Sequence, residues 1–414
     1  MVKESYRILT KDYVMNNDTW QTGLNNNDLI IGTSGCGKTR GYVIPNILQM
    51  NESMIIADSK GRLRKELSGI LESNGYKIIN IDFMDLANSA GYNPLDYIRY
   101  NAKKETYSVQ DIKTIAACIV PCEDKVQPFW EMAARMYFES IIAYVMECLP
   151  ENEHNLELAV QLFKEMNTGK FVRLFMELEQ LNPDSFAVGQ YKMFKDNDKA
   201  AKMHESIRGI LAEKLSMIAF DDANEMFCKE NRIDFADIGR QKTAVFVAVS
   251  DTDRSMDTLA NLFYTQAIHV LCDSADRDYA DGRLKMPVRL LLDDFATNVY
   301  LPDFDKTIAM IRSREVYVSL ILQSLSQLES LYGHAKAMTI INNCDNLLYL
   351  GGQDVETARY IGIKADKPTS AILNMPLSKA WLFTRGQAPK EVEKFIPQSH
   401  VRYKELPEYM RKAG

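Results

Sequence analysis

The chain has 414 residues, of which 46% carry apolar or aromatic side chains and 25% are charged, a composition typical of a globular protein with two or three domains. This balance excludes a disordered chain and a collagen-like one. The 49 lysines and arginines against 56 aspartates and glutamates give a net charge of −7, so no global positive field attracts nucleic acid or anionic lipid. Nucleic-acid binding would need local basic patches or a ring of subunits.

The cysteines and histidines argue against a disulfide framework and against a zinc site. The seven cysteines are scattered without a CxxC pair, and the five histidines do not cluster with them. The first twenty residues lack the apolar core of a signal peptide, and no window approaches the ~20 apolar residues of a membrane helix. We therefore expect a reduced, cytoplasmic chain that does not itself span a membrane.

Short apolar runs alternate with helical stretches in the first hundred residues. The runs LIIG, SMIIAD and YKIINID are typical of parallel strands that are buried on both faces. From about Ser108 to Phe220 the period becomes helical, with one apolar stripe at steps of three and four. The stripe consists of Trp130, Ala134, Tyr137, Ile141, Val145 and Cys148. Strand signals return in TAVFVAV, VRLLL, VYVSLIL and NLLYL, followed by the shorter run AWLF.

A complete phosphate-binding pattern, G-x-x-x-x-G-K-[ST], follows the first strand signal. It consists of Gly32, Thr33, Ser34, Gly35, Cys36, Gly37, Lys38 and Thr39. Glycines let backbone N–H groups surround phosphate oxygens, and the next helix points its positive end at them. Lys38 is expected to reach the β- and γ-phosphates of ATP, and the Thr39 hydroxyl to ligate Mg²⁺. The alternative is a glycine-rich turn that matches by chance, which the strand before and the helix after argue against.

The alternation of elements predicts an α/β fold with a mostly parallel central sheet and an inserted all-α domain. With its P-loop, this arrangement resembles a RecA-like P-loop NTPase domain. The first part of the nucleotide-binding domain is expected at 1–103 and the inserted all-α domain at 104–236. Residues 237–414 are expected to complete the nucleotide-binding domain and to form a C-terminal tail.

Two carboxylates follow the apolar run VRLLL. Asp293 is the candidate for the metal side of a P-loop ATPase site, and Asp294 is the candidate general base that polarises the attacking water. The alternative is an aspartate that caps the next helix. Hydrolytic ATPases of this type usually have glutamate at the position of Asp294, whose side chain is shorter by one C–C bond, ~1.5 Å.

The run VYVSLIL ends in Gln323, which therefore lies at the carboxyl edge of the sheet, where open α/β sheets bind ligands. Gln323 is a candidate for orienting the water or sensing the γ-phosphate, and a plain strand-end hydrogen bond is the alternative. Just upstream, Arg312 and Arg314 are candidates for an arginine finger that reaches a neighbouring subunit's nucleotide in a ring. A solvated helix end is the alternative for both.

Several segments between Leu29 and Pro397 carry a family signature in a fixed order. They are GTSGCGKTRGYVIPNIL, IIADSKGRLRKEL, GYNPLDYI, PFWEMAARMYFESIIAYV, LLLDDFA, LILQSLSQLESLYG, INNCDNLLYLGGQDVETARYI and, more weakly, LFTRGQAPKEVEKF. In order and wording they resemble the type IV secretion coupling proteins, ring ATPases of conjugation systems in the FtsK–HerA superfamily. The P-loop helix is a specific match, because Pro45 stands where helix propensity opposes it.

The resemblance implies roles for the candidate residues. It assigns ATP binding to Gly32 through Thr39, the Walker B role to Asp293 and Asp294, γ-phosphate sensing to Gln323, and the finger to Arg312. It also matches Asp58 and Lys60 to the family's Asp-Pro-Lys-Gly segment, in which Ser59 replaces the proline here, and gives them a supporting role.

The resemblance further implies a coupling ATPase that recruits a relaxase bound to single-stranded DNA and pumps it towards a secretion channel. ATP and Mg²⁺ would be the cofactors, and a homo-hexameric ring at the inner face of the cell membrane would be the active form. Typical members begin with transmembrane helices, whereas this chain starts about thirty residues before its P-loop. The anchor is thus expected on another chain, or the chain is a soluble variant or a truncated one, and a monomer in isolation is the alternative to the ring.

Two other functions stay open at this point. One is a nucleotide-binding adaptor that hydrolyses ATP weakly, with Asp294 as the sign of lost hydrolysis. The other is a coupling protein that delivers protein effectors only.

Overall fold

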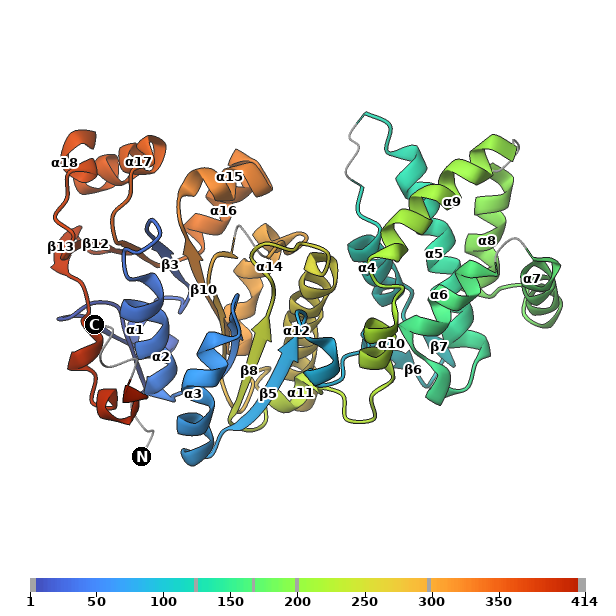
Figure 1. The fold of residues 1–414 in the computed structure, drawn as a ribbon, viewed down its shortest axis with the longest axis horizontal. Helices are drawn as coiled ribbons and strands as arrows, with labels where there is room; N and C mark the ends of the chain where they lie inside the picture. The colour runs from blue at the N-terminus through green and yellow to red at the C-terminus, as the bar shows by residue number, and fades with distance from the viewer. Residues whose placement is uncertain (1–4, 123–125, 166–167, 198–200, 296–298, 409–414) are drawn as a thin grey trace. The chain divides into compact units, whose positions relative to one another are not determined.

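The computed structural model describes residues 5–408 except 123–125, 166–167, 198–200 and 296–298. The chain forms two compact units, coloured along the chain in Figure 1. The sheet unit consists of Met1–Asp82, Asp234–Arg254 and Ala267–Gly414, and the helical unit of Phe83–Ile233 and Ser255–Gln266. The boundaries expected at 103/104 and 236/237 stay predictions, and the sheet unit's first segment ends earlier than the first of them, at Asp82.

The sheet unit is built on one sheet of nine strands in the order β13-β12-β11-β3-β10-β9-β4-β8-β5. The strands from β11 to β5 are parallel, and β12 and β13 are antiparallel additions at one edge. Their bounds are β3 (Asp28–Ile31), β4 (Ser53–Ala57), β5 (Lys77–Asp82), β8 (Thr243–Ala248), β9 (Val288–Leu292), β10 (Val316–Leu322), β11 (Asn346–Tyr349), β12 (Lys379–Thr384) and β13 (Lys390–Glu393). The predicted α/β fold with a mostly parallel sheet is confirmed.

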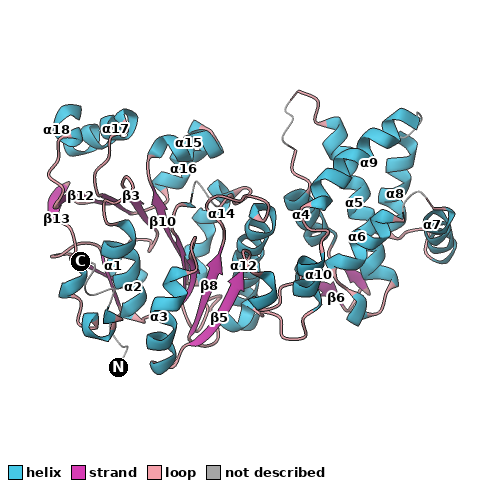
Figure 2. Cartoon of the chain, in the orientation of Figure 1, coloured by secondary structure: helices cyan, strands magenta, loops and turns pink. Residues whose placement is uncertain are grey.

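The central strands form because their side chains are apolar on both faces, as parallel strands covered by helices require. Every residue of β3, β4, β8, β9, β10 and β11 is buried. On one face, Ile30, Ile56 and Leu291 belong to a core cluster that includes Ile47 and Leu67 from the helices after β3 and β4. Figure 2 shows helices flanking the strands of this unit.

The helices of the sheet unit follow the strands in alternation. They are α1 (Thr19–Thr22), the π-helical segment η1 (Thr39–Val43), α2 (Ile44–Gln49), α3 (Arg62–Ser73), α11 (Phe235–Ile238), α14 (Phe304–Met310), the 3₁₀ turn η5 (Ile311–Arg314), α15 (Leu325–Tyr332), α16 (His334–Asn342), α17 (Val355–Ala365) and α18 (Thr369–Leu373). Helix α12 (Asp257–Asp278) contributes to both units.

A small hairpin of β1 (Tyr6–Ile8) and β2 (Val14–Asn16) precedes the sheet. These strands have three residues each, too few for an alternation of apolar and polar residues to be recognised in the sequence.

The helical unit contains almost only helices (Figure 2). They are α4 (Val109–Ile119), α5 (Phe129–Cys148), α6 (Leu156–Lys164), α7 (Gly169–Leu181), α8 (Phe186–Asn197), α9 (Ala201–Ser216) and α10 (Asp221–Cys228), and a two-residue pair, β6 (Tyr100–Asn101) and β7 (Thr106–Tyr107), precedes them. The apolar stripe of α5 is buried from Ala134 to Val145, but Cys148 at its end is exposed. The buried stripe is therefore one turn shorter than the predicted one. None of the helices formed by the described residues combines the length and the apolar character that a bilayer crossing requires.

Candidate nucleotide-binding site

Three neighbouring parallel strands bring the predicted site residues to one edge of the sheet. Strand β10 lies between β3 and β9, and Leu322 of β10 pairs with Ile31 of β3, the last residue before the P-loop. Gln323 therefore follows β10 at the level where the P-loop begins, and Asp293 follows β9 on the other side. The carboxyl ends of parallel strands are where open α/β sheets bind ligands.

The P-loop has the backbone that its glycines allow. Gly35 and Gly37 have φ of +78° and +98°, which residues with a Cβ rarely adopt. At Gly32 a Cβ would lie 2.3 Å from the Cys36 Sγ atom and 3.0 Å from the Leu350 Cβ atom, so a side chain there would force its neighbours to move. The loop is held at its start by the Gly32 N–H, which donates to the Leu322 carbonyl at 3.0 Å.

The two P-loop residues that are expected to contact phosphate and metal have distinct partners. The Lys38 ammonium donates to the Gly32 carbonyl at 2.8 Å and to the Thr33 carbonyl at 3.3 Å, so it lies folded over the loop. The Thr39 hydroxyl donates to Asp293 Oδ2 at 2.7 Å. This bond joins the P-loop directly to the first carboxylate after β9, as a shared magnesium site requires.

The second carboxylate and the glutamine lie beside this pair. Gln323 Nε2 approaches Asp294 Oδ1 at 3.4 Å, the long end of a hydrogen bond. Asp294 has a left-handed backbone with φ of +53°, a conformation that Asp and Asn tolerate better than most residues do. Burial raises the pKa of Asp293, and the neighbouring Asp294 carboxylate adds to the rise, while the bond from Thr39 opposes it. The alternative role of Asp294 as a helix cap concerns residues 296–298, which lie outside the described part of the chain.

A metal with oxygen ligands fits the Thr39 and Asp293 oxygens. Mg²⁺ prefers hard oxygen ligands and is commonly held by one or two protein groups together with substrate phosphates. In the described residues no group of three or more His, Cys, Asp or Glu side chains forms a metal site of its own. The residues present therefore fit an ion that arrives with a nucleotide.

Arg312 is not brought to the other site residues within the chain. It lies in η5, before β10 begins, and its Nη2 atom approaches the Thr19 carbonyl at 3.5 Å. Gln323 lies at the other end of the seven-residue strand β10, roughly 20 Å along the sheet. Arg314 is held by Asp276, with Nη2 to Oδ2 at 2.7 Å. Neither arginine can therefore reach this chain's own P-loop without a large movement.

Asp58 and Lys60 lie beside the acidic pair but have different surroundings. Asp58 accepts hydrogen bonds from the Arg62 and Arg64 N–H groups, both at 2.9 Å, so it caps the start of α3. Lys60 forms an exposed ion pair with Asp251 at 3.6 Å. Both line a cavity of about 260 Å³ that also reaches Thr39, Asp293 and Asp294.

A second cavity, of about 270 Å³, also borders the P-loop. Its walls combine P-loop residues with apolar side chains from β11, from the residue directly after β11 and from the segment after β13; these are Leu348, Leu350, Phe395, Ile396 and Pro397. Lys394 Nζ donates to the Cys36 carbonyl at 3.1 Å, which attaches this late segment to the P-loop.

Apart from the P-loop residues Cys36 and Gly37, the residues of this second cavity were not predicted as site residues. Arg40, which directly follows Thr39, lines both cavities, and its place next to the motif was the one signal that could have indicated it. The part of the wall near Lys394 could not be found from periodicity, because the segment after Glu393 has no regular period that places it against the P-loop.

Comparisons with known proteins agree with this arrangement. A family model described as "Type IV secretory system Conjugative DNA transfer" matches residues 1–371. The protein VirD4 of Rhizobium rhizogenes is 22% identical over 357 residues, which cover 86% of this chain and 51% of VirD4. The chain thus spans about half the length of this curated relative.

Solved structures share the fold. The unbound form of the bacterial conjugative coupling protein TrwBΔN70 matches with a TM-score of 0.69 and 16% identity, covering 95% of this chain and 90% of that one. TrwB in complex with ADP and Mg²⁺ matches with a TM-score of 0.64 and 18% identity, over 90% of this chain and 86% of the other. Because the family match extends over most of the chain and the fold agrees, the chain belongs to the family of type IV secretory system conjugative DNA transfer proteins.

Proposed function

We propose that this chain is the motor part of a type IV secretion coupling ATPase, which hydrolyses ATP to move a relaxase with its single-stranded DNA towards a secretion channel at the inner face of the cell membrane. The observation that carries the proposal is the Thr39–Asp293 hydrogen bond at 2.7 Å. It joins a complete P-loop to a strand-end carboxylate, the pairing that P-loop ATPases use to hold Mg²⁺.

In this proposal ATP binds across the two cavities beside the P-loop. The phosphates contact the loop N–H groups, and the Lys38 ammonium exchanges the carbonyls of Gly32 and Thr33 for phosphate oxygens. The nucleoside would lie in the cavity near Phe395, which borders the P-loop and has the apolar lining typical of ligand pockets. Thr39 and Asp293 would hold Mg²⁺, which neutralises the charge that develops on the phosphates.

Hydrolysis is assigned to the pair on the other side of the γ-phosphate position. Asp294 would accept a proton from the attacking water, and Gln323, whose amide approaches Asp294 at 3.4 Å, would orient that water. A positioned general base contributes roughly 10²–10⁴-fold to a rate.

The net charges suggest which part of the chain contacts which part of the substrate. Residues 104–236 hold 15 lysines and arginines against 23 aspartates and glutamates, 15 − 23 = −8, which is more negative than the whole chain at −7. An acidic surface repels DNA phosphates. We therefore assign selection of the protein part of the substrate to the inserted helical domain, and the DNA contacts to the sheet unit.

One observation favours the second candidate function, a nucleotide-binding adaptor with weak hydrolysis. Asp294 is shorter than the usual glutamate, and its left-handed backbone with φ of +53° fixes where its carboxylate can reach. A base set back from the water would slow chemistry that depends on close positioning.

The experiment that tests the main proposal is an ATPase assay with and without single-stranded DNA over a range of protein concentrations. A DNA-translocating ring is expected to show turnover that rises with concentration and is stimulated by DNA. Binding of ATP with no turnover under any of these conditions would favour the adaptor. Turnover that responds to a protein effector but not to DNA would favour delivery of protein effectors only.

Arg312 provides a prediction about the ring. Because it lies roughly 20 Å along the sheet from its own site, it is expected to act only on a neighbour's nucleotide. Arg312→Ala should remove the concentration-dependent part of the turnover. Arg314→Ala should keep it, because the guanidinium of Arg314 is already paired with Asp276 of the same chain.

Mixing Lys38→Ala with Arg312→Ala subunits checks this assignment. A Lys38→Ala subunit retains Arg312 and can supply it to the intact P-loop of an Arg312→Ala subunit, so the mixture should regain activity. Turnover of Arg312→Ala equal to wild type at high concentration would remove the arginine from the mechanism.

A further inference from the structure

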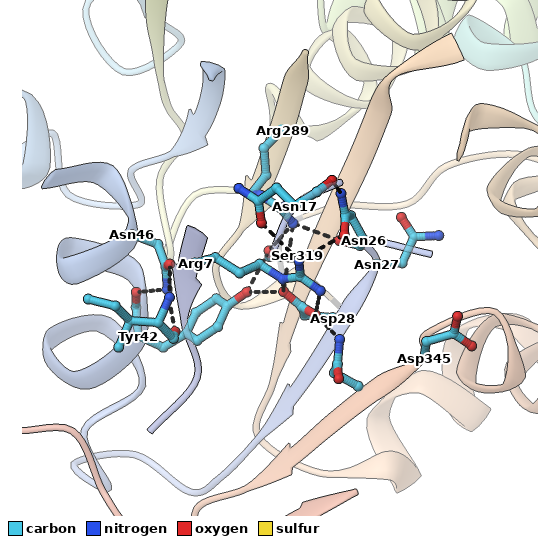
Figure 3. Close-up of polar contacts among 12 residues, drawn as sticks. Arg7, Asn17, Asn26, Asn27, Asp28, Tyr42, Asn46, Arg289, Ser319 and Asp345 are labelled. Carbon is cyan, nitrogen blue, oxygen red and sulfur yellow. Dashed lines mark hydrogen bonds and ion pairs between the residues drawn. The ribbon is translucent and has the colours of Figure 1, made fainter. Parts of the chain in front are cut away.

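The helix that follows the P-loop is attached to the N-terminal strand through the side chain of Asn46. The Asn46 Oδ1 atom accepts from the Ile8 N–H at 2.8 Å, and its Nδ2 atom donates to the Ile8 carbonyl at 2.8 Å. Nδ2 also donates to the Tyr42 carbonyl at 2.8 Å. One amide thus pairs with both backbone groups of a residue in β1, as a neighbouring strand would, and it is buried (Figure 3).

The preceding residue explains why the helix is unusual at this point. Pro45 has no N–H to donate to the Gly41 carbonyl, which an α-helix would require. The helix accommodates the proline with the π-helical segment Thr39–Val43, in which the Ile44 N–H donates to the Thr39 carbonyl. Short π-helical segments inside α-helices are frequent at functional sites. The Pro45–Asn46 pair is the part of the sequence signature for which the ATPase chemistry alone gives no role.

Tyr42, in the same turn, is bonded to the start of the P-loop strand. Its hydroxyl donates to Asp28 Oδ2 at 2.7 Å and lies 2.8 Å from Ser319 Oγ. Since the single hydroxyl proton of Tyr42 is used on Asp28, Ser319 is the donor in the second bond. Asp28 is the first residue of β3, and Tyr42 lies in the π-helical turn after the P-loop. The Tyr42–Asp28 bond therefore connects the two ends of the chain segment that contains the whole P-loop.

Asp28 is an anion in a buried network of charges. Arg7 of β1 binds it with two bonds, Nε to Oδ2 at 2.6 Å and Nη2 to Oδ1 at 3.0 Å, and Arg289 Nη1 lies 3.7 Å from Oδ2. Burial would raise the pKa of Asp28, but the two guanidiniums and the hydrogen bonds outweigh it and hold the pKa below its usual range. Burial and the charge of Asp28 raise the pKa of Tyr42 well above its usual value, so its hydroxyl stays a donor. Figure 3 shows these side chains converging on Asp28 from separate segments of the chain.

We propose that Tyr42 and Asn46 are positioning residues of the nucleotide site, which hold the helix that begins at Thr39 in its binding orientation and make that orientation depend on strand β1. The proposal rests on the proposed binding of ATP at the P-loop. The N–H groups of the loop and the Thr39 hydroxyl have to point at the phosphates and the metal before binding. When the helix is already anchored in the folded protein, the entropy of ordering it is lost on folding and does not weaken ATP binding.

The consequence for binding follows from populations. If the helix is released from Asp28 or from Ile8, only a fraction of the molecules holds the loop in the competent state, and the apparent dissociation constant for ATP rises by the inverse of that fraction. Saturating ATP selects the competent state again. The expected signature is therefore a higher KM with a nearly unchanged kcat, whereas partial unfolding would lower kcat by reducing the active fraction without moving KM.

The test uses two variants of the full chain and one matched control. Tyr42→Phe removes only the hydroxyl, and Asn46→Ala cuts the connection to Ile8 while it leaves the Tyr42–Asp28 bond. Tyr92→Phe is the control, because Tyr92 is also fully buried and donates its hydroxyl to Gln266 Oε1 at 2.6 Å, but in the helical unit. Both test variants should raise KM for ATP about tenfold, the effect of losing one hydrogen bond to a charged or buried partner, and the control should not.

A second measurement needs no nucleotide. Hydrogen exchange of the amides in 39–49 should be faster in Tyr42→Phe and Asn46→Ala than in wild type, and unchanged in the control, at a temperature well below unfolding. If wild type itself fails to bind ATP, the proposed function is wrong, while the exchange data still decide the anchoring. Tyr42→Phe with wild-type KM and wild-type exchange in 39–49 would overturn the inference.

Discussion

Replacing Lys38 by alanine is expected to abolish ATP hydrolysis, by on the order of 10³-fold or more, and to remove tight ATP binding. The side chain is nearly buried, and its ammonium lies over the loop carbonyls of Gly32 and Thr33, so it has only a short way to move to reach phosphate oxygens. No other side chain of the P-loop carries a positive charge. Alanine leaves the phosphates without that charge in a site where water is partly excluded, and electrostatic stabilisation is strongest there.

The fold should survive this substitution, because only two loop carbonyls lose the ammonium, and one of them belongs to Thr33, which is exposed and can bond to water, while the other belongs to the buried Gly32. Lys229→Ala is the matched control, since Lys229 Nζ also donates to backbone carbonyls, those of Leu86, Ala87 and Ser89, but lies in the helical unit. A nucleotide-binding titration, an ATPase assay and a thermal melt on both variants separate the effects. Normal turnover in Lys38→Ala would contradict the proposed function itself.

The sequence predicted the central strands well because most of their residues are apolar. Runs such as VRLLL and VYVSLIL match β9 and β10 residue for residue, because short, largely apolar runs, the more so when rich in β-branched and aromatic residues, favour strands that are buried on both faces. The hairpin of β1 and β2 was missed, because three-residue strands carry no period. Its significance lies in Arg7 and the Ile8 backbone, whose partners Asp28 and Asn46 are far away in the sequence.

The candidate site was predictable to the extent that its residues follow strands. Strand order brings Thr39, Asp293 and Gln323 to one edge, so three separate sequence motifs become one site. The wall near Phe395 was not predictable, because its position depends on two antiparallel strands added at the edge of the sheet. The left-handed backbone of Asp294 could not be predicted from the sequence either, since aspartate adopts this conformation only at a few positions, which the tertiary structure determines.

That backbone conformation sharpens the last prediction, which concerns the role of Asp294. Asp294→Asn is the cleanest variant, because asparagine tolerates a left-handed backbone as well as aspartate does and caps helices equally well. It removes only the negative charge and the ability to accept a proton. If Asp294 is the general base, Asp294→Asn should lower turnover roughly 10²–10⁴-fold while ATP still binds. Asp294→Ala should lose as much turnover, with an added cost of about 1 kcal/mol in stability for a left-handed alanine.

Asp294→Glu tests the reach of the base. The longer side chain moves the carboxylate forward by ~1.5 Å, towards the water that related motors activate, but glutamate in a left-handed backbone costs roughly 1–2 kcal/mol. We expect the longer reach to compensate in the rate and the strain to appear as a lower melting temperature, so this variant should keep turnover while it unfolds earlier. ATPase rates and thermal melts on the three variants separate the roles. Wild-type turnover in Asp294→Asn would reject catalysis by this residue. If Asp294→Glu and Asp294→Asn are both inactive, the site is built around the shorter acid, whose carboxylate lies 3.4 Å from the Gln323 amide that fixes its position.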